Sequence, residues 1–325
     1  MNSETLLKIE NVKKYFPVKS SLFSREKKTV RAVDGVSFEL NKGEVLGLVG
    51  ESGCGKSTLG RTIVRLYDPS EGKIEFLGED ITGLSSKELK SRRANFQMIF
   101  QDPYSSLNPR MTVEQILIEP FLIHGVCDKE TAKKEIVKLL EDVGLSKGAA
   151  KKYPHEFSGG QRQRIGIARA LALKPKMIVA DEAVSALDVS IQSQVLNILK
   201  DLLEKYGLSY IFISHDLAVV EHICDRVAVM YLGKIVEIAP KEELFNNPKH
   251  PYTRALISSI PKASIREKSS KREVLEGDVP SPLSPPSGCS FHPRCASATD
   301  KCKSAAPVLK GHGSNAHQVS CHLFD

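Results

Sequence analysis

Short runs of apolar residues alternate with longer amphipathic segments along this chain. Near the N-terminus the runs LLKIENV, AVDGVSFEL and EVLGLVG are rich in Val and Leu and are separated by turn residues, which predicts three strands. The polar segment between the first two, residues 17–31, predicts a surface loop. A helix is expected to begin after the third run and to continue through STLGRTIVRLY until Asp68 and Pro69 stop it.

The middle of the chain, from about residue 105 to residue 165, is predicted to be mostly helical. VEQILIEPFLIHG and DKETAKKEIVKLLEDVGL carry apolar residues at helical spacing, and Gly144 lies where the second helix would end. Farther on, the strands MIVADE, SYIFISHD and RVAVMY alternate with the helices SIQSQVLNILKDLLEKYG and LAVVEHI. Buried apolar strands that alternate with helices are typical of a mostly parallel α/β sheet.

The pattern changes at about Pro261, where Pro, Ser and charged residues become frequent and predict an extended linker. With 325 residues, 41% of them hydrophobic, the chain has enough apolar surface for one large domain and an appendage. We therefore expect a first domain over residues 1–260 and a small extension over residues 261–325.

The formal net charge of +7 is compatible with nucleic acid, an anionic membrane face or phosphate ligands as partners. The basic residues are spread along the chain without a long block of one sign, so most of them are expected on a solvated surface. No apolar run approaches the roughly 20 residues that span a bilayer, and the first residues lack the apolar core of a secretion signal. We expect the protein in the cytosol.

The clearest chemical motif is GESGCGKS at Gly50–Ser57, which fits the phosphate-loop pattern G-x-x-x-x-G-K-[ST] between a predicted strand and a predicted helix. Its glycines allow backbone N–H groups to converge on phosphate oxygens, and the start of the helix adds a favourable dipole. Lys56 would reach the outer phosphates, and the Ser57 hydroxyl would contact Mg²⁺.

Two carboxylates end the strand MIVADE, at the edge where open α/β sheets bind ligands. Asp181 is placed to hold Mg²⁺ through water, and Glu182 is the candidate general base that would polarise an attacking water. The alternative is the start of a solvated loop, where an Asp-Glu pair is common.

The stretch SGGQRQR at Ser158–Arg164 begins with the Ser-x-x-Gln pattern of a capped helix, and Ile165, Ala168 and Leu171 follow at helical spacing. Free N–H groups at the start of this helix would form a second anion site by the same physics as the first. The heptapeptide alone favours an ordinary capped helix.

Taken together and in this order, the motifs resemble those of the ATPase subunits of ABC transporters. The stretches that carry the resemblance are the Walker A loop Gly50–Ser57, the Q-loop FQDP with Gln101, the signature SGGQRQR, the Walker B strand MIVADE, the D-loop Ser185–Asp188 and the H-loop ISHD with His215. The resemblance covers residues 6 to about 240. It implies an α/β fold of the P-loop NTPase class, an ABC cassette with a RecA-like mixed sheet core and a helical subdomain. A small Cys-rich C-terminal extension would follow the cassette.

The resemblance also implies a head-to-tail dimer, in which ATP lies between the Walker A loop of one subunit and the signature helix of the other. Glu182, His215 and Gln101 would be catalytic, and Tyr15 resembles the aromatic residue that stacks on adenine, with an ordinary core or surface tyrosine as the alternative. The implied Mg²⁺ ligands are Ser57, Gln101 and Asp181. The implied nucleotide-binding residues are Tyr15, Gly50, Ser52, Gly53, Cys54, Gly55, Lys56, Ser57, Thr58, Ser158, Gly159, Gly160, Gln161 and Asp188.

Two further stretches, MIFQDPYSSLNPRMTVEQILIEP and NPKHPYTRALISSIP, closely resemble the ATPases of dipeptide and oligopeptide importers. The resemblance implies a peripheral protein on the cytoplasmic face of the cell membrane, two transmembrane permease subunits as partners, and an extracytoplasmic peptide-binding protein as an indirect one. The second ATPase subunit would be a paralogue or a copy of this chain, with a heterodimer favoured.

The sequence leaves three alternatives to the ATPase subunit of a peptide importer. The first is the ATPase subunit of a nickel or other solute importer of the same architecture. The second is a soluble ABC ATPase that acts on nucleic acid, which the single cassette without long inserts disfavours. The third is a metal-bound regulatory protein that binds nucleotide without hydrolysis, which the presence of Glu182 and His215 disfavours.

Seven cysteines are present, and four of them are bunched near the C-terminus: Cys289, Cys295, Cys302 and Cys321. In a reducing cytosol such bunching indicates metal ligation more than disulfides. Four sulfurs suit Zn²⁺ or an iron–sulfur cluster, and spacing without C-x-x-C does not choose between them. The resemblance implies a [4Fe–4S] cluster. The segment is expected to be irregular, with three nearby histidines on its surface that are alternative ligands: His292, His317 and His322.

Overall fold

The computed structural model of the protein describes residues 4–18, 28–260, 277–312 and 314–325. The chain forms two compact units, each made of discontinuous segments. The first unit comprises residues 1–7, 40–45 and 76–213, and the second comprises residues 8–39, 46–75 and 214–325. Among the described residues, no helix is both long and apolar enough to cross a membrane.

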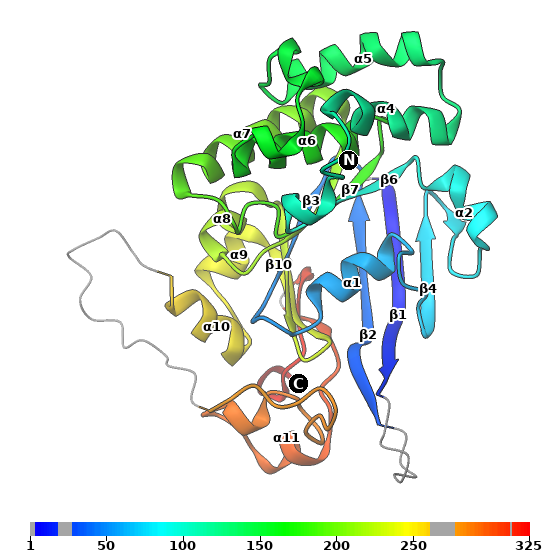
Figure 1. The fold of residues 1–325 in the computed structure, drawn as a ribbon. Helices are drawn as coiled ribbons and strands as arrows, with labels where there is room; N and C mark the ends of the chain where they lie inside the picture. The colour runs from blue at the N-terminus through cyan, green and yellow to red at the C-terminus, as the bar shows by residue number, and fades with distance from the viewer. Residues whose placement is uncertain (1–3, 19–27, 261–276, 313) are drawn as a thin grey trace. The chain divides into compact units, whose positions relative to one another are not determined.

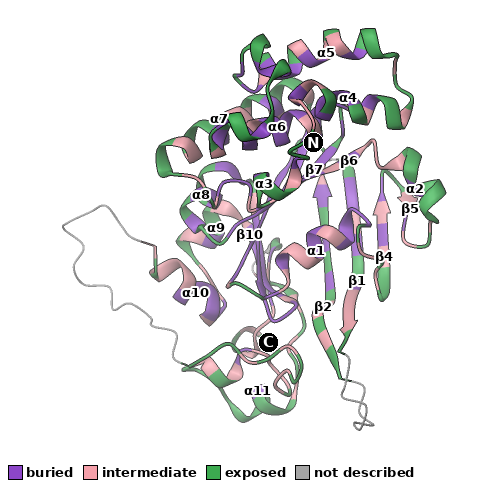
Figure 2. Ribbon diagram, in the orientation of Figure 1, coloured by how far each residue is buried: buried purple, intermediate pink, exposed green. Residues whose placement is uncertain are grey.

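The first unit contains three parallel strands, β6 (Phe96–Ile99), β7 (Met177–Asp181) and β8 (Ser209–Ile213). Met98 pairs with Val179, which in turn pairs with Ile211. Every residue of β7, which is labelled in Figure 2, and of β8 is buried, which explains why the sequence shows continuous apolar runs here and no alternation.

The other elements of the first unit are mainly helices. They are α2 (Ser86–Arg92), α3 (Pro103–Ser106), α4 (Val113–His124), α5 (Lys129–Asp142), α6 (Gly159–Leu171) and α7 (Val189–Tyr206), with the 3-10 turns η1 (Lys147–Lys151) and η2 (Pro154–Glu156) and the short strand β5 (Glu79–Asp80). Helices α4, α5 and α6 pack against one another (Figure 1). The helices expected between residues 105 and 165 are therefore present.

The second unit holds the greater part of β1 (Thr5–Pro17), β2 (Thr29–Asn41), β3 (Val45–Val49) and β4 (Glu71–Phe76). Its other elements are α1 (Lys56–Ile63), α8 (Leu217–Ile223), β9 (Arg226–Tyr231), β10 (Lys234–Pro240), α9 (Lys241–Asn246), α10 (Pro251–Ser258), η3 (His292–Arg294), α11 (Asp300–Ser304), β11 (Lys310–His312), β12 (Ser314–Val319) and η4 (His322–Phe324).

Parallel and antiparallel pairs coexist in this second unit. Strand β3 pairs with β9 in parallel, with Leu46 opposite Arg226. Strand β9 then pairs antiparallel with β10, β10 with β12, and β12 with β11. The sheet is therefore mixed, as the resemblance to ABC cassettes implied. The pairs that the apolar runs predicted to be parallel, β6 with β7, β7 with β8 and β3 with β9, are parallel.

The helix after the phosphate loop is shorter than expected. We predicted that it would continue to Asp68, but α1 ends at Ile63. The reason is local: Arg65 has a left-handed φ of 53°, and both Leu66 and Tyr67 donate backbone hydrogen bonds to the carbonyl of Arg61. A residue with positive φ does not continue a right-handed helix, so the chain turns there.

Two expected irregular segments fall largely outside the described residues. Of the surface loop predicted at 17–31, residues 19–27 are not described, and the flanking strands extend to Pro17 and from Thr29. Of the linker predicted from Pro261, residues 261–276 are not described, and residues 277–288 contain no helix or strand.

The Cys-rich tail is more ordered than its composition suggested. Its strand β12 adds to β10, with Glu237 opposite Val319, so the tail extends the sheet of the second unit. Phe291 is 2% exposed and lies 5.3 Å from the ring centre of Tyr231 and 5.4 Å from that of Tyr252. Strand pairing and a buried aromatic residue hold the tail in place, in addition to any metal.

Candidate nucleotide site

The phosphate loop has the geometry that its motif predicts. Strand β3 ends at Val49, directly before Gly50, and α1 begins at Lys56 with Gly55 as its N-cap. The N-cap makes no side-chain hydrogen bond to this helix, and the N–H groups at a helix start favour an anion. The Lys56 ammonium folds back over the loop and donates to the carbonyls of Gly50 at 2.7 Å and of Glu51 at 3.0 Å.

Two positions of the loop require glycine for steric reasons. A Cβ on Gly50 would lie 2.2 Å from the carbonyl oxygen of Met230, and a Cβ on Gly55 would lie 2.0 Å from that of Ala32. Both glycines also have positive φ, of 150° and 105°. The surrounding backbone therefore fixes the curvature of the loop, and any side chain at these positions would displace it.

Tyr15 lies in β1, in the second unit, and is half-buried. Its hydroxyl donates to Asp34, and the Arg31 guanidinium lies 6.0 Å from the centre of its ring. Burial and the Asp34 carboxylate raise the pKa of Tyr15 to about 12. These contacts fix the ring, and its role against adenine stays a prediction.

The two carboxylates at the end of β7 differ in environment. Asp181 is fully buried, whereas Glu182 is half-buried and has a left-handed φ of 47°, which is costly for a residue other than glycine. The backbone N–H of Glu182 donates to the carbonyl of Ile213 at 3.0 Å, which holds this conformation. The Gln101 amide donates to the Glu182 carboxylate at 2.7 Å, so the Q-loop and Walker B residues meet within the first unit.

The signature helix starts as the sequence predicted. Ser158 Oγ accepts from the N–H of Gln161 at 3.4 Å, and Gln161 Oε1 accepts from the N–H of Ser158 at 3.0 Å, which completes a capping box. Gly160 is buried, and a Cβ there would lie 2.4 Å from Cγ2 of Ile191. Ser158 itself is exposed at the start of α6.

The remaining predicted residues are distributed over both units. Asp188 is the exposed N-cap of α7 in the first unit, and its side chain makes no capping hydrogen bond. His215 is exposed in the second unit, next to Asp216, which caps α8. The phosphate loop also belongs to the second unit, whereas Gln101, Asp181 and Glu182 belong to the first.

Comparison with known proteins identifies this arrangement. Residues 33–185 match the ABC transporter family, and residues 236–302 match the C-terminal region of oligopeptide/dipeptide transporters. The chain is 57% identical to the oligopeptide transport ATP-binding protein AppF of Bacillus subtilis, over 99% of this chain and 98% of that protein. The chain belongs to the ATP-binding subunits of oligopeptide/dipeptide ABC transporters.

Other relatives agree with this membership. The ABC ATPase is 53% identical to a probable peptide ABC transporter ATP-binding protein, y4tS of Sinorhizobium fredii, over 99% of the chain and 90% of the relative. Among solved structures, the ATP-binding cassette MJ0796, a dimer bound to ADP and phosphate, matches with a TM-score of 0.65 and 28% identity, over 73% of this chain and 99% of that chain. The cbiO1 protein of Clostridium perfringens matches with a TM-score of 0.64 and 26% identity, over 75% of this chain and 92% of that one.

The four tail cysteines of the ABC ATPase line one small cavity. Cys289, Cys295, Cys302 and Cys321 are all free thiols, and together with His250 and Phe291 they surround a cavity of about 10 Å³, which is near the size of one water molecule. Burial raises the pKa of Cys321 to about 11 and also raises the pKa of Cys289 and Cys295. Over the described ranges, no group of three or more Cys, His, Asp or Glu side chains is arranged to hold a metal ion.

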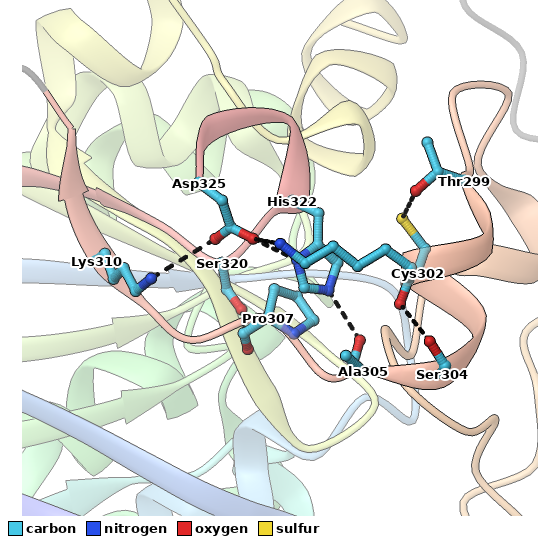
Figure 3. Close-up of polar contacts among 10 residues, drawn as sticks. Thr299, Cys302, Ser304, Ala305, Pro307, Lys310, Ser320, His322 and Asp325 are labelled. Atoms are coloured by element: carbon cyan, nitrogen blue, oxygen red, sulfur yellow. Dashed lines mark hydrogen bonds and ion pairs between the residues drawn. The ribbon is translucent and has the colours of Figure 1, made fainter.

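The tail histidines are engaged in hydrogen bonds. His322 contacts the carboxylate of Asp325 at 2.6 Å through Nδ1 and the carbonyl of Ala305 at 2.9 Å through Nε2 (Figure 3). The same carboxylate pairs with Lys301 at 2.5 Å, and His322 and Lys301 hold its pKa well below the usual range. Both ring nitrogens of His322 are thus occupied, which disfavours it as a metal ligand.

Contrary to our expectation, the side chains of two of these histidines, His317 and His322, are not at the surface. His317 is 3% exposed, and its Nε2 lies 2.8 Å from Glu237, a fully buried carboxylate that also accepts from the backbone N–H of Lys249 and of His250. His292 is half-buried, and its Nδ1 lies 2.9 Å from the carbonyl of Cys289. The Glu237 contact could not be predicted from the sequence, because it depends on how β12 pairs with β10.

Proposed function

We propose that this ABC ATPase binds and hydrolyses ATP to power the import of oligopeptides or dipeptides through a membrane permease. The observation that carries the proposal is 57% identity to an oligopeptide transport ATP-binding protein across 99% of the chain, joined to a second family match in the tail. Within this proposal, residues 1–260 form the ATPase domain and residues 261–325 form the Cys-rich extension.

For the chemical step, we assign binding of the phosphates to the loop Gly50–Ser57, with Lys56 as the positive charge. Glu182 is the general base: it takes a proton from the attacking water as the water oxygen bonds to the γ-phosphorus. The bond from that phosphorus to the oxygen of ADP then breaks, and ADP and phosphate leave. The contact from Gln101 supports this assignment, because it orients the Glu182 carboxylate.

Mg²⁺ is expected in the same site. Hydroxyl, amide and carboxylate oxygens are the ligands that Mg²⁺ prefers, and Ser57, Gln101 and Asp181 supply one of each. The ion would neutralise charge that develops on the phosphate oxygens. Gln101 and His215 are exposed, so both are accessible to a nucleotide or to another subunit.

A second cassette is proposed to complete the site. Ser158, Gly159, Gly160 and Gln161 form the start of α6, where N–H groups and the helix dipole favour an anion. In the head-to-tail arrangement these residues bind the ATP held by the partner, and Asp188 crosses the interface. The partner is a paralogue or a second copy of this chain, and the MJ0796 relative was solved as a dimer.

The permease is proposed to dock on the helices of the first unit. A groove of about 570 Å³ lies among α4, α5 and η1 and is lined by both apolar and charged side chains, such as Ile118, Leu122 and Glu119. Leu122 and Ile123 are 50% and 53% exposed beside this groove, and exposed apolar side chains that lie together are typical of interaction sites. The groove begins ten residues after Gln101 in the sequence.

The four cysteines are proposed to bind a [4Fe–4S] cluster, with Zn²⁺ as the alternative. Four free thiols around one cavity match the donor set of such a cluster, in which each cysteine binds a different iron. The present cavity is small, so the sulfurs would have to move outward on loading.

Metal analysis separates these alternatives. Protein purified without oxygen should contain about four irons and four sulfides per chain, with a visible absorption band. The variant Cys302→Ser should lose the iron, while Cys127→Ser, which alters a half-buried cysteine outside the tail, should keep it. Stoichiometric zinc without sulfide would contradict the cluster.

The transport function is tested with the complete transporter in lipid vesicles. The ATPase, purified with its permease subunits and supplied with the peptide-binding protein, should take up a labelled oligopeptide only when ATP is present on the ATPase side. Nickel should not compete. Uptake of nickel without uptake of peptide would favour the related solute importers, and co-purification with nucleic acid in place of permeases would contradict the proposal.

A further inference from the structure

Glu51, the residue after Gly50 in the phosphate loop, is held by the C-terminal part of the chain. Its backbone N–H donates to the hydroxyl of Tyr252 at 2.8 Å. Its carboxylate accepts two hydrogen bonds from the Arg294 guanidinium, one of 2.7 Å to Oε2 and one of 3.0 Å to Oε1. Main chain and side chain of Glu51 are thus both fixed by residues more than 200 positions away in the sequence.

Arg294 belongs to the Cys-rich tail, in the short turn η3 between Cys289 and Cys295. Its side chain is only 5% exposed, and its guanidinium lies 5.9 Å from the ring centre of Tyr231. The backbone N–H of Arg294 donates to the carbonyl of Phe291, the residue that anchors the tail on Tyr231 and Tyr252. The position of the guanidinium therefore depends on the folded tail.

An acidic side chain in a phosphate-binding loop is unfavourable on its own, because its charge repels the ligand. A two-pronged guanidinium contact neutralises that charge and also fixes its direction, which an ammonium group cannot do in the same way. The carbonyl of Glu51 is one of the two acceptors for the Lys56 ammonium, so the backbone of Glu51 helps to place the lysine that meets the phosphates.

We propose that Arg294 is a positioning residue of the nucleotide site, through which the Cys-rich tail neutralises Glu51 and sets the phosphate loop for ATP. The inference rests on the proposed function only in that the loop binds ATP. The contact of Arg294 with Glu51 makes the affinity for nucleotide depend on whether the tail is folded. Loss of order around the four cysteines should therefore weaken ATP binding.

The test is the dissociation constant of a fluorescent ATP analogue for the full-length chain. Arg294→Ala should weaken binding about tenfold, in line with the loss of a charge-assisted pair, and Arg294→Lys should recover part of it. The matched control is Arg92→Ala, because Arg92 makes a similar two-pronged contact to Glu79 in the first unit, and it should leave the constant unchanged. An unaltered constant in Arg294→Ala would overturn the proposal.

A second variant separates neutralisation from general damage to the tail. Glu51→Gln removes the charge with little change in shape, so the double variant Glu51→Gln with Arg294→Ala should bind within about threefold of the parent. A tail that has merely lost its fold would not be rescued by this change, and failure of the rescue would overturn the proposal. A parent chain that binds no nucleotide would instead contradict the proposed function.

Discussion

The amide of Gln101 donates a hydrogen bond of 2.7 Å to the carboxylate of Glu182, although the two residues are 81 positions apart in the sequence. The Q-loop thereby orients the proposed general base directly. Glu182 also adopts a left-handed backbone conformation, so the orientations of both its main chain and its side chain are fixed. Any element that moves the Q-loop would move the base.

The first prediction concerns this contact. Gln101→Ala removes the donor and should lower kcat for ATP about tenfold or more, because a misplaced base transfers the proton poorly. Measured without Mg²⁺, the affinity for ATP should change little. Gln97→Ala is the control: Gln97 lies on β6 and donates its amide to the carbonyl of Arg93, away from Glu182. Steady-state ATPase assays of the assembled transporter measure both, and an unaffected kcat in Gln101→Ala would refute the orienting role.

The second prediction compares the two glycines of the signature. Gly160→Ala would bring a Cβ within 2.4 Å of Cγ2 of Ile191, whose branched side chain cannot turn away freely, so it should destabilise the protein by about 1–3 kcal/mol. Gly159→Ala meets only Cδ2 of Leu187, at 3.8 Å, and should not destabilise it. Chemical denaturation of the full-length chain gives both values. Equal effects of the two substitutions would show that Ile191 does not restrict Gly160.

The third prediction concerns pH. Asp142 at the end of α5 accepts hydrogen bonds from Lys205, at 2.5 Å, and from Tyr206 on α7. Burial alone would raise the pKa of Asp142, but these two donors outweigh it and lower the pKa below 3.8. Since the folded pKa is depressed, the stabilisation is present above the unfolded value near 3.8 and is lost as the pH falls through the folded value.

The substitution Asp142→Asn should therefore lower the free energy of unfolding by about 1–2 kcal/mol at pH 7. This difference from the parent should shrink as the pH falls below about 4, where the carboxylate of the unfolded parent is protonated. Glu130→Gln, which alters an exposed ion pair with Lys133, serves as the control and should have no measurable effect. A difference that is constant between pH 7 and pH 3 would contradict the assignment.

The sequence predicted the strands and helices of both units well where the signal is local. Strands β7, β8 and β9 appear as apolar runs because all or nearly all of their residues are buried, and the capping box of Ser158 and Gln161 is a contact over three residues. The phosphate loop was likewise predictable, because its glycines lie close together in the sequence. The early end of α1 was missed, because the left-handed turn at Arg65 has no glycine or proline to announce it.

Contacts between distant residues were not predictable from one sequence. The pair of Arg294 and Glu51 spans 243 positions, and the pair of His317 and Glu237 spans 80. Each depends on how the tail docks, which is set by the pairing of β12 with β10 and by burial of Phe291. Local periodicity carries no information about such docking, so His317 was expected at the surface and Arg294 was not singled out.

The most direct test of the account is ATP-driven peptide uptake by the transporter that carries Glu182→Gln. The substitution keeps the shape of the side chain and removes its capacity to accept a proton, so ATP should still bind while hydrolysis falls by about 10²- to 10⁴-fold. Uptake of a labelled oligopeptide into lipid vesicles should fall in parallel, with ATP trapped between the two cassettes. Hydrolysis and uptake at the parental rate would contradict the claim that Glu182 activates the water that powers import.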